Sequence, residues 1–588
     1  MHSIQSIIAN LWVIGLRYLH SLPINIDLCR LKLFLLRGHL ALINGIILLS
    51  SLLFLAACDN ISGRGGENSA NALKLKEYVA AQRANHSKDL IDIRSEFGSD
   101  LSGIKLVDID LSGVDFSGIN LSKAQISRAK LSKSKFYQTN LDDAIIQESD
   151  FTGAEFHTIV ARGADMQASL FTNAIISLSD FSNANFDDAD LSEVKIIDTT
   201  MSRASFTNAI FTSSNLSNVN FKEASLTGLS AASLQGKDIS FWGADLRKAK
   251  FNHAILSNIY LESSDLSQVD FSGASISGDL TNTTLVDTKL TGAKITSTSF
   301  SSADISNSNF DNAQISGSIF SNTKFIKLSM SKANIDDSTF EKTTFVEGAI
   351  NDTKISNSNF AGASFSHLDL SKLIVVNSNF NSASWENLTV TSSSFDKSNM
   401  TGSVIISSEM VSSVIQNTIL AEVTFYQTNL ESNMFKNNDM SMIAIVGAKF
   451  IGNNFVNSKI IGAQFSDNIG EKNLFTNSPI SNSIVLNSPS VIVFAMNAIT
   501  DLKAINASID LSYHNLSYMK LGGFNFDKVN LNHSLLKYVS CKKCSFKDAD
   551  LSFTDLTMAD FSNAVLDGAK LDDAILNGTI LDQATPQF

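Results

Sequence analysis

Two cysteines three residues apart, Cys541 and Cys544, have the spacing in this chain that most suggests chemistry. A Cys-Lys-Lys-Cys segment has the spacing of a redox pair or of one half of a zinc site. Zinc needs four ligands, however, and the sequence has no second pair near these two. Free cysteine is commonly buried, so we expect both side chains to be small core residues and a disulfide between them to be geometrically doubtful.

Other chemically active residues show no recognisable spacing. The nine histidines are scattered, and we find no metal-ligand spacing, phosphate-binding loop or nucleophile elbow. Carboxylates are numerous, and pairs at catalytic distance could arise by stacking alone, but solvated surface charge explains them better. The sequence therefore predicts a protein that is not an enzyme, with no catalytic residues, no metal and no cofactor.

The elements that carry these residues follow a period of five. From Leu101 to Leu581 a large apolar residue, the central position of each pentad, recurs at nearly every fifth place, usually with a small residue two places earlier. Of the 39 phenylalanines, 32 lie on the central position, all except Phe34, Phe54, Phe97, Phe494, Phe524, Phe553 and Phe588. Helices repeat every 3.6 residues and strands every two, so neither alone gives this period. A short extended segment followed by a corner does, with the central and small residues facing one interior.

Three stretches show the motif clearly: Ala189-Asp190-Leu191-Ser192-Glu193, Ala244-Asp245-Leu246-Arg247-Lys248 and Ala549-Asp550-Leu551-Ser552-Phe553. In these repeats the chain resembles the pentapeptide-repeat family. The resemblance implies an all-β fold, a right-handed quadrilateral parallel β-helix (solenoid) with four pentads in each coil. At about 20 residues per coil and roughly 4.8 Å between coils, residues 101–581 would form a rod on the order of 115 Å long.

Two interruptions of the period predict local irregularities. One residue is missing from a pentad near 277–280, which predicts a tightened corner or a kink. Ala231 and Gly236 occupy central positions, which predicts an underfilled coil.

The amino-terminal segment has the order of an export signal. Residues 40–57 form a largely apolar run preceded by Arg30, Lys32 and Arg37. Leu55-Ala56-Ala57-Cys58 then resembles the lipobox of bacterial lipoproteins, which implies that Cys58 is acylated, with palmitate among the acyl chains, and becomes the first residue after cleavage. The alternative is an uncleaved membrane helix, because the run approaches the roughly 20 residues that span a bilayer. Either reading predicts a protein tethered to a membrane of the bacterial cell envelope, with inner or outer membrane left open.

The predicted organisation follows from these signals. It comprises a signal peptide or leader (1–57), the lipidated cysteine and a flexible tether (58–72), a short helical cap (73–100), a long solenoid (101–485), an irregular hinge or loop (486–510), a short solenoid (511–581) and a tail (582–588).

Charge argues against nucleic acid as a partner. The formal net charge is −13, which is mild acidity for so long a rod, and the sequence has no basic stripe. Some pentapeptide-repeat proteins are similar to duplex DNA in shape and charge and protect topoisomerases. Acids interleaved with lysines and an export signal both argue against that role here.

One surface feature is visible in the short solenoid. Stepping by 20 from the second residue after the central position places apolar side chains in columns on two adjacent faces: Tyr513, His533 and Phe553, then Tyr518, Tyr538 and Met558. Such a strip suits a protein contact or glycan stacking, although these side chains could also lie only over the corners of their own coils. We expect the strip, with the last coil, to form a homodimer or partner interface.

These observations together predict a membrane-anchored, non-enzymatic scaffold or spacer that contacts the lipid bilayer through its acyl chains and an unidentified protein or glycan through its surface. Three alternatives remain open at this point: a cell-surface adhesin, a glycan-active β-helix enzyme, and a DNA-mimicking topoisomerase-protection protein.

Overall fold

The computed structural model describes residues 65–85, 90–470, 472–478, 480–486, 499–505, 511–513, 515–518 and 521–586. The chain divides into two units, Met1–Glu67 and Asn68–Phe588. The predicted leader and most of the predicted tether lie outside the described residues. The second unit contains the coils.

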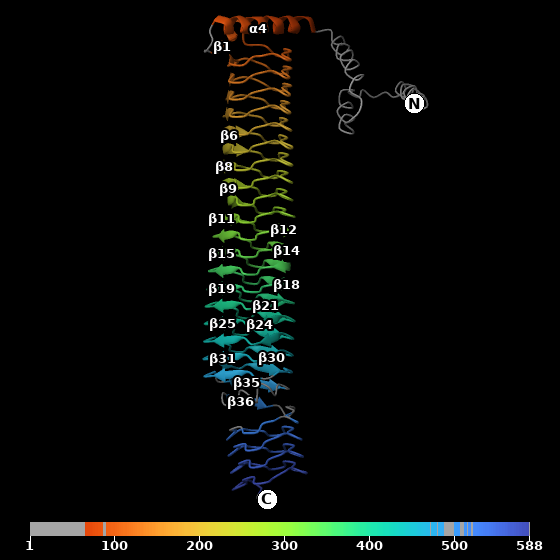
Figure 1. Cartoon of the computed structure of the whole chain (residues 1–588), viewed down its shortest axis with the longest axis vertical. Coiled ribbons are helices and arrows are strands. Elements are labelled where there is room, and N and C mark those ends of the chain that lie inside the picture. Colours follow the sequence, from red (N-terminus) through yellow and green to blue (C-terminus); the bar gives the residue numbers. More distant parts are fainter. Residues whose placement is uncertain are drawn as a thin grey trace, which may run out of the picture. The chain divides into compact units, whose positions relative to one another are not determined.

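Two parallel sheets account for the strands of the described residues (Figure 1). The first sheet consists of β1 (Ile91–Asp92), β2 (Val114–Asp115), β3 (Lys135–Tyr137), β4 (Glu155–His157), β5 (Ile175–Ser177), β6 (Lys195–Thr200), β7 (Asn215–Asn220), β8 (Gln235–Lys237), β9 (Ile255–Tyr260), β10 (Ser275–Asp279), β11 (Lys294–Ser299), β13 (Gln314–Ser316), β15 (Asn334–Asp336), β17 (Lys354–Ser356), β19 (Ile374–Val376), β22 (Ser394–Asp396), β25 (Val414–Gln416), β28 (Met434–Lys436), β31 (Asn454–Val456) and β34 (Leu474–Thr476). The second consists of β12 (Asp304–Ser306), β14 (Lys324–Ser329), β16 (Thr344–Ala349), β18 (Ser364–Asp369), β20 (Ser384–Glu386), β21 (Thr389–Thr391), β23 (Val404–Ile406), β24 (Glu409–Val411), β26 (Thr424–Tyr426), β27 (Asn429–Glu431), β29 (Ala444–Val446), β30 (Lys449–Ile451), β32 (Ile460–Ile461), β33 (Gln464–Ser466), β35 (Ile480–Leu486) and β36 (Ile499–Ile505).

Each residue of a strand pairs with the residue one coil later. Phe325, for example, pairs with Phe345, and Phe345 pairs with Phe365, so four pentads complete one coil. The backbone N–H of Leu121 donates to the Asn140 carbonyl at 2.7 Å, and similar bonds join coil to coil along the stack. Central residues are buried from 101 to 465, while the second corner residue of most pentads has a positive φ. The predicted fold class, an all-β parallel β-solenoid with very little helix, is confirmed.

Stacked phenylalanine rings fill much of the interior. Phe320, Phe340, Phe360 and Phe380 form one column, with ring centroids 4.6, 4.6 and 4.8 Å apart. Each ring buries apolar surface, and a stacked pair adds about 0.5–1.5 kcal/mol beyond that burial. The column therefore couples each coil to the next through side chains as well as through backbone hydrogen bonds.

Polar residues at the small position form hydrogen-bond ladders inside the core. The Ser393 hydroxyl donates to the Leu370 carbonyl at 2.8 Å. Further along the same column the Asn453 amide donates to the Leu430 carbonyl at 2.8 Å and to Oδ1 of Asn473 at 3.0 Å. Because these buried groups are paired, they can replace alanine there without the penalty of an unsatisfied polar atom.

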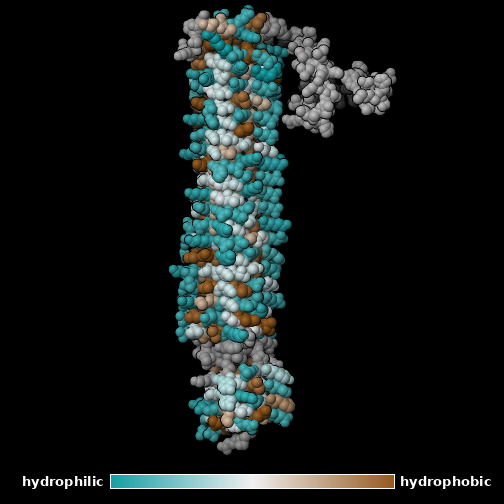
Figure 2. Space-filling model, viewed as in Figure 1, coloured by the Kyte–Doolittle hydropathy of each residue, from teal (hydrophilic) through white to brown (hydrophobic). Residues whose placement is uncertain are grey.

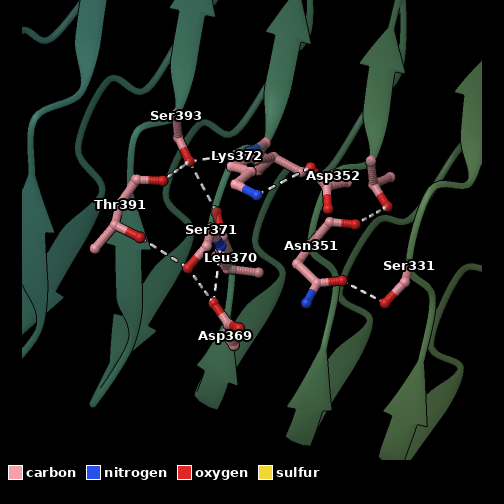
Figure 3. A network of polar contacts seen from close by, with 11 residues as sticks. Ser331, Asn351, Asp352, Asp369, Leu370, Ser371, Lys372, Thr391 and Ser393 are labelled. Atoms are coloured by element: carbon pink, nitrogen blue, oxygen red, sulfur yellow. Dashed lines mark hydrogen bonds and ion pairs between the residues drawn. The ribbon is translucent and has the colours of Figure 1, made fainter.

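Similar ladders run along the outside of the coils, as Figure 3 shows. The Thr391 hydroxyl donates to that of Ser371 at 2.8 Å, and Lys372 lies 3.9 Å from the Asp352 carboxylate one coil away. In Figure 2 the visible face of the coils is mostly hydrophilic, with hydrophobic residues scattered over it. Exposed pairs of this kind contribute little each, so stacking of the core remains the main source of stability.

The shortened pentad is absorbed at Gly278 in β10. The pairing register of β10 with both neighbours shifts between Ile276 and Gly278. Gly278 has φ +144°, and a Cβ there would lie 2.0 Å from the Ile259 carbonyl oxygen. Only glycine allows this close approach of two coils.

The predicted underfilling at Gly236 is wrong. A Cβ on Gly236 would lie 2.7 Å from Cδ1 of Ile239 and 3.0 Å from Cδ2 of Leu256. These two side chains already occupy the space that a larger central residue would take. The sequence pattern missed this because it assigned the space to one position, although neighbouring pentads share it.

Helix α4 (Gly65–Asn85) covers the first coils, followed by the short helix α5 (Arg94–Phe97) (Figure 1). Leu75 and Val79 of α4 are buried, and Arg83 lies 2.9 Å from the Asp110 carboxylate while donating to the Ser112 carbonyl at 2.7 Å. α4 begins within the tether expected from composition. Its contacts cover strand edges that would otherwise be open to pairing.

The predicted hinge or loop at 486–510 lies mostly outside the described residues. Within it, β36 pairs with β35 in parallel, with several shifts of register.

Candidate interaction surface at the C-terminal coils

The six residues of the predicted strip lie on successive coils as two columns, which we call the aromatic corner surface: Tyr513, His533 and Phe553 in the first column, Tyr518, Tyr538 and Met558 in the second. Each is the second residue of a corner, so its side chain leaves the coil at an edge. The two columns border the same side of the solenoid. The columns drawn from the sequence therefore exist in the structure.

Rings within each column stack on one another. The His533 ring lies 4.8 Å from the Tyr513 ring and 4.6 Å from the Phe553 ring, centroid to centroid. The Tyr518 and Tyr538 rings lie 5.0 Å apart with an interplanar angle of 8°. Ring faces thus cover each other, and the ring edges are turned to solvent.

These side chains are strongly exposed although they stack. The exposed fractions are 75% for Tyr513, 74% for Tyr518, 50% for Tyr538, 49% for Phe553 and 54% for Met558. Single surface aromatics are ordinary, but a contiguous group of this size marks an interaction site more often than a solvent contact.

The backbone at these positions makes the choice of residue unusual. Tyr513, Tyr518, Tyr538 and Phe553 have φ between 57° and 69°. Among the described residues, tyrosine and phenylalanine occur at positive φ nowhere else, whereas mostly polar residues and Gly occupy this corner along the long solenoid, with Leu178 and Met442 among the exceptions. Left-handed backbone costs a bulky residue roughly 1–2 kcal/mol more than it costs glycine. The aromatic residues are therefore not the ones that the corner itself favours.

An ion pair lies between the two columns. Nζ of Lys537 is 2.9 Å from Oδ2 of Asp555, and Leu535 is exposed beside it. Burial acts to raise the pKa of Asp555, but hydrogen bonds from Thr557 and Lys537 outweigh it and hold that pKa below its usual value. The same hydrogen bond raises the pKa of Lys537, so both groups stay charged.

Cys541 and Cys544 form a disulfide in the adjoining coils, which corrects the expectation of two free thiols. Their Cα atoms are 5.4 Å apart, both residues are fully buried, and the Cys544 N–H donates to the Cys541 carbonyl at 3.2 Å. The corner between a central residue and the next small residue turns both side chains inward, which brings the two sulfurs together. The sequence pattern placed both side chains in the interior but did not show that the corner brings them within bonding distance.

The last described coil is less covered than the others. Its central residue Leu576 is 42% exposed, whereas central residues in the long solenoid are buried. Its strand edges face no further coil within the described residues.

A second cluster, on β3, β4 and β5, was missed by sequence reasoning. Nδ1 of His157 lies 2.9 Å from the Ser177 hydroxyl, and the His157 ring meets the Tyr137 ring edge-on at 5.5 Å. The Tyr137 hydroxyl donates to Glu155, which raises the pKa of Tyr137 to about 12, and Lys135 lies 3.8 Å from the same carboxylate. Stepping by 20 from Tyr137 gives His157 and Ser177, so the column rule applied at the other end would have found them.

This cluster has a nucleophile and a base but lacks the other parts of an acyl-transfer site. The nearby backbone N–H groups of Thr158 and Leu178 donate to carbonyls of the next coil, which leaves them unable to stabilise an oxyanion. The contact between His157 and Ser177 is exposed to solvent. We therefore assign the cluster to inter-coil pairing.

The carboxylates with a resolved pKa shift are held in the charged form. Burial acts to raise their pKa values, but hydrogen bonds and neighbouring cations outweigh it, so each of these pKa values is lowered. The carboxylates concerned, among the described residues, are Asp100, Asp108, Asp110, Asp142, Glu223, Asp245, Asp270, Asp336, Asp439, Asp550, Asp555 and Asp560. A general acid near neutral pH needs the opposite shift. The described part of the chain also holds no group of three or more side chains arranged to bind a metal ion.

Cys58, the predicted lipidation site, lies outside the described residues. Within those residues, no helix is both long and apolar enough to cross a bilayer.

The coil geometry and its repeat define a class of protein: a parallel β-solenoid built from five-residue units. The model of the pentapeptide repeats matches in eight copies, among them those at residues 97–132, 119–157, 189–228, 240–278, 279–312, 303–342 and 544–583. The matched coils are pentapeptide repeats. The coils from 343 to 470 keep the same geometry outside the matched ranges.

Solved structures with related coils include HetL, a pentapeptide repeat protein involved in heterocyst differentiation regulation from the cyanobacterium Nostoc sp. strain PCC 7120. The identity is 20%, over 41% of this chain and 95% of HetL, with a TM-score of 0.24. QnrB1, a plasmid-mediated fluoroquinolone resistance protein, is 17% identical over 36% of this chain and 81% of its own, with a TM-score of 0.12. The periplasmic alginate epimerase AlgG is 10% identical over 62% of this chain and 76% of its own, with a TM-score of 0.17. No curated protein matches the chain in sequence.

Proposed function

We propose that this protein is a non-catalytic scaffold or spacer of the bacterial cell envelope, anchored in a membrane by acylated Cys58 and contacting a partner through its C-terminal coils. The observation that carries the proposal is the aromatic corner surface. It combines strong exposure with residue types that the left-handed corner disfavours, so a requirement other than folding must keep them there.

The disulfide supports a location outside the cytosol. Disulfides persist in oxidising compartments and are rare where thiols are kept reduced. The Cys541–Cys544 bond is therefore compatible with export through the leader. An exported chain would not meet a cytosolic topoisomerase.

The surface charges support a structural role rather than catalysis or DNA mimicry. Acids and bases pair between neighbouring coils, for example Arg128 with Asp108 at 2.7 Å and Arg162 with Asp142 at 2.8 Å. Paired acids do not present the uninterrupted negative lattice of a nucleic acid. Their lowered pKa values also keep them from donating protons near neutral pH.

The exposed aromatic corner surface supports a partner at the C-terminal coils. A protein partner, a glycan or a second copy of the chain are the candidates for this surface.

The mass of the amino-terminal peptide tests the anchor. Native protein extracted from membranes is compared with the Cys58→Ala variant by mass spectrometry. A diacylglyceryl-modified Cys58 at the amino terminus, absent from the variant, supports the proposal. An intact Met1 leader without lipid contradicts the lipid anchor and returns cytosolic targets to consideration.

A further inference from the structure

The way the rings stack bears on what the aromatic corner surface binds. A sugar ring binds an aromatic side chain by lying on its open face. In this surface, both faces of His533 are covered by Tyr513 and Phe553, and Tyr518 and Tyr538 cover one face of each other. Besides the outer faces of the rings at the ends of each stack, the open groups are ring edges, tyrosine hydroxyls and the Met558 thioether, and this mixture suits contacts with protein side chains.

The repeat distance restricts the partner further. Within each column the ring spacing of 4.6–5.0 Å matches the separation of neighbouring coils. A partner that meets all three rows equally well must present side chains at the same spacing. A second copy of this solenoid has that spacing by construction.

The exposed area is sufficient for such a contact. At roughly 150–250 Å² for a whole large side chain, the exposed portions of the two columns without His533 sum to on the order of 600 Å². Standard interfaces bury about 800 Å² on each partner, and the rim around Leu535 and Lys537 can supply the remainder.

We propose that two copies of the chain pair side by side and in parallel through the aromatic corner surface. The parallel direction rests on the proposed function, because two chains anchored in one membrane through Cys58 have their amino termini at the same level. Anchoring in one membrane also raises the effective concentration of each chain near the other.

A twofold axis along the solenoid then fixes which side chains meet. It brings the first column of one copy against the second column of the other, row by row. Tyr513 meets Tyr518 of the second copy, His533 meets Tyr538, and Phe553 meets Met558. Each row thus combines two rings or a ring and a thioether, which are favourable pairings.

The first test measures the oligomeric state of the full chain, extracted from membranes and purified, by light scattering. We expect a dimer whose dissociation constant rises at least tenfold in Tyr518→Asn with Tyr538→Asn. Asparagine accepts the left-handed corner, so the thermal unfolding transition and the circular dichroism spectrum should be retained. The matched control, Lys528→Asn with Asp548→Asn, changes corner residues in the same coils on another edge and should leave the dimer intact. A monomeric wild-type chain at micromolar concentration, or a dimer that survives the tyrosine substitutions, overturns the proposal.

A second test determines direction by disulfide cross-linking in membranes. Chains carrying His533→Cys and chains carrying Tyr538→Cys, produced together, should cross-link to each other, whereas His533→Cys alone should not. Cross-linking of His533→Cys to itself would mean an antiparallel pair and overturns the parallel arrangement. Mass spectrometry of the same preparation determines whether Cys58 carries a lipid. A lipidated chain that stays monomeric refutes the pairing alone. A cross-linked pair with unmodified Cys58 refutes the anchor alone.

Discussion

Tyr518 and Tyr538 stack with ring centroids 5.0 Å apart from two backbone positions that both have positive φ. The left-handed corner backbone is thus occupied by tyrosine, which is unfavourable in that conformation, and the spacing of the coils brings the two rings into contact. Elsewhere in the described coils the same corner holds mostly small or polar residues, with Leu178 and Met442 as exceptions, and inter-coil contacts run mainly through the core and the polar ladders. These two residues also combine positive φ with exposure, but among the described residues aromatic side chains at such positions stack into columns only in these C-terminal coils.

Replacing Trp385 by phenylalanine should raise the free energy of unfolding by about 1 kcal/mol. Its Nε1 is buried and has no hydrogen-bond partner among the described residues, and such a group costs about 1–3 kcal/mol. The neighbouring cavity of about 10 Å³ is lined by apolar side chains and offers no acceptor. Urea denaturation measures the change. Trp385→Ala, by contrast, should lower stability by about 3–5 kcal/mol, and a loss of that size in the phenylalanine variant would contradict the explanation.

The internal ladder makes Asn453 sensitive to substitution. Asn453→Ala should lower the free energy of unfolding by about 3 kcal/mol, because it leaves the Leu430 carbonyl and the Asn433 backbone N–H without their partners in the core. Asn453→Ser is the matched variant, since Ser393 and Ser413 fill the same column. Asn453→Ser should lower the free energy of unfolding clearly less than Asn453→Ala does. Equal losses in the two variants, measured by urea denaturation, would mean that volume rather than hydrogen bonding governs this position.

Gly278 should tolerate no side chain. Gly278→Ala places a Cβ 2.0 Å from the Ile259 carbonyl oxygen, and we expect a loss of about 3 kcal/mol or more. Gly292 has φ +66° and open space around its Cβ direction, so Gly292→Ala should cost only about 1 kcal/mol. Thermal unfolding of the two variants side by side checks this. Similar melting temperatures would show that the coils can move apart at the shortened pentad.

Tyr137 should ionise late in an alkaline titration. Its hydrogen bond to Glu155 raises its pKa to about 12 from an ordinary value of 10. Because the folded pKa is the higher one, the contribution to stability is complete below pH 10 and is lost as the pH rises through 12. Tyrosinate absorbance in the wild-type chain, compared with Glu155→Gln, measures the shift. If the two titrations coincide, Glu155 is not its cause.

The period of five predicted the fold because it reports directly which residues face inward. The columns of Tyr513 and Tyr518 followed from the same arithmetic, since residues 20 apart must lie on one edge. Arithmetic on single pentads did not show that Ile239 and Leu256 fill the space at Gly236, or that a corner brings Cys541 and Cys544 together. Both depend on how neighbouring sides share the interior, which the identity of one residue does not reveal.

The cluster at Tyr137, His157 and Ser177 was missed for another reason. Each of these residues is ordinary at an outward position, and only their stacking joins them. The hydrogen-bond ladder of Asn433 and Asn453 was likewise not predicted, because the sequence pattern treated this position only as a small residue.

The uniform pentad makes the direction of every outward side chain a matter of counting. Removing one pentad from the regular coils would rotate all later side chains by a quarter turn around the solenoid axis. Removing four pentads would shorten the stack by one coil and leave the direction of every later side chain unchanged. The shortened pentad at Gly278 neither rotates the later coils nor shortens the stack by a coil. The missing residue is accommodated where Gly278 approaches Ile259 closely. Insertions and deletions in multiples of 20 can therefore change how far a docking edge reaches without changing where it points.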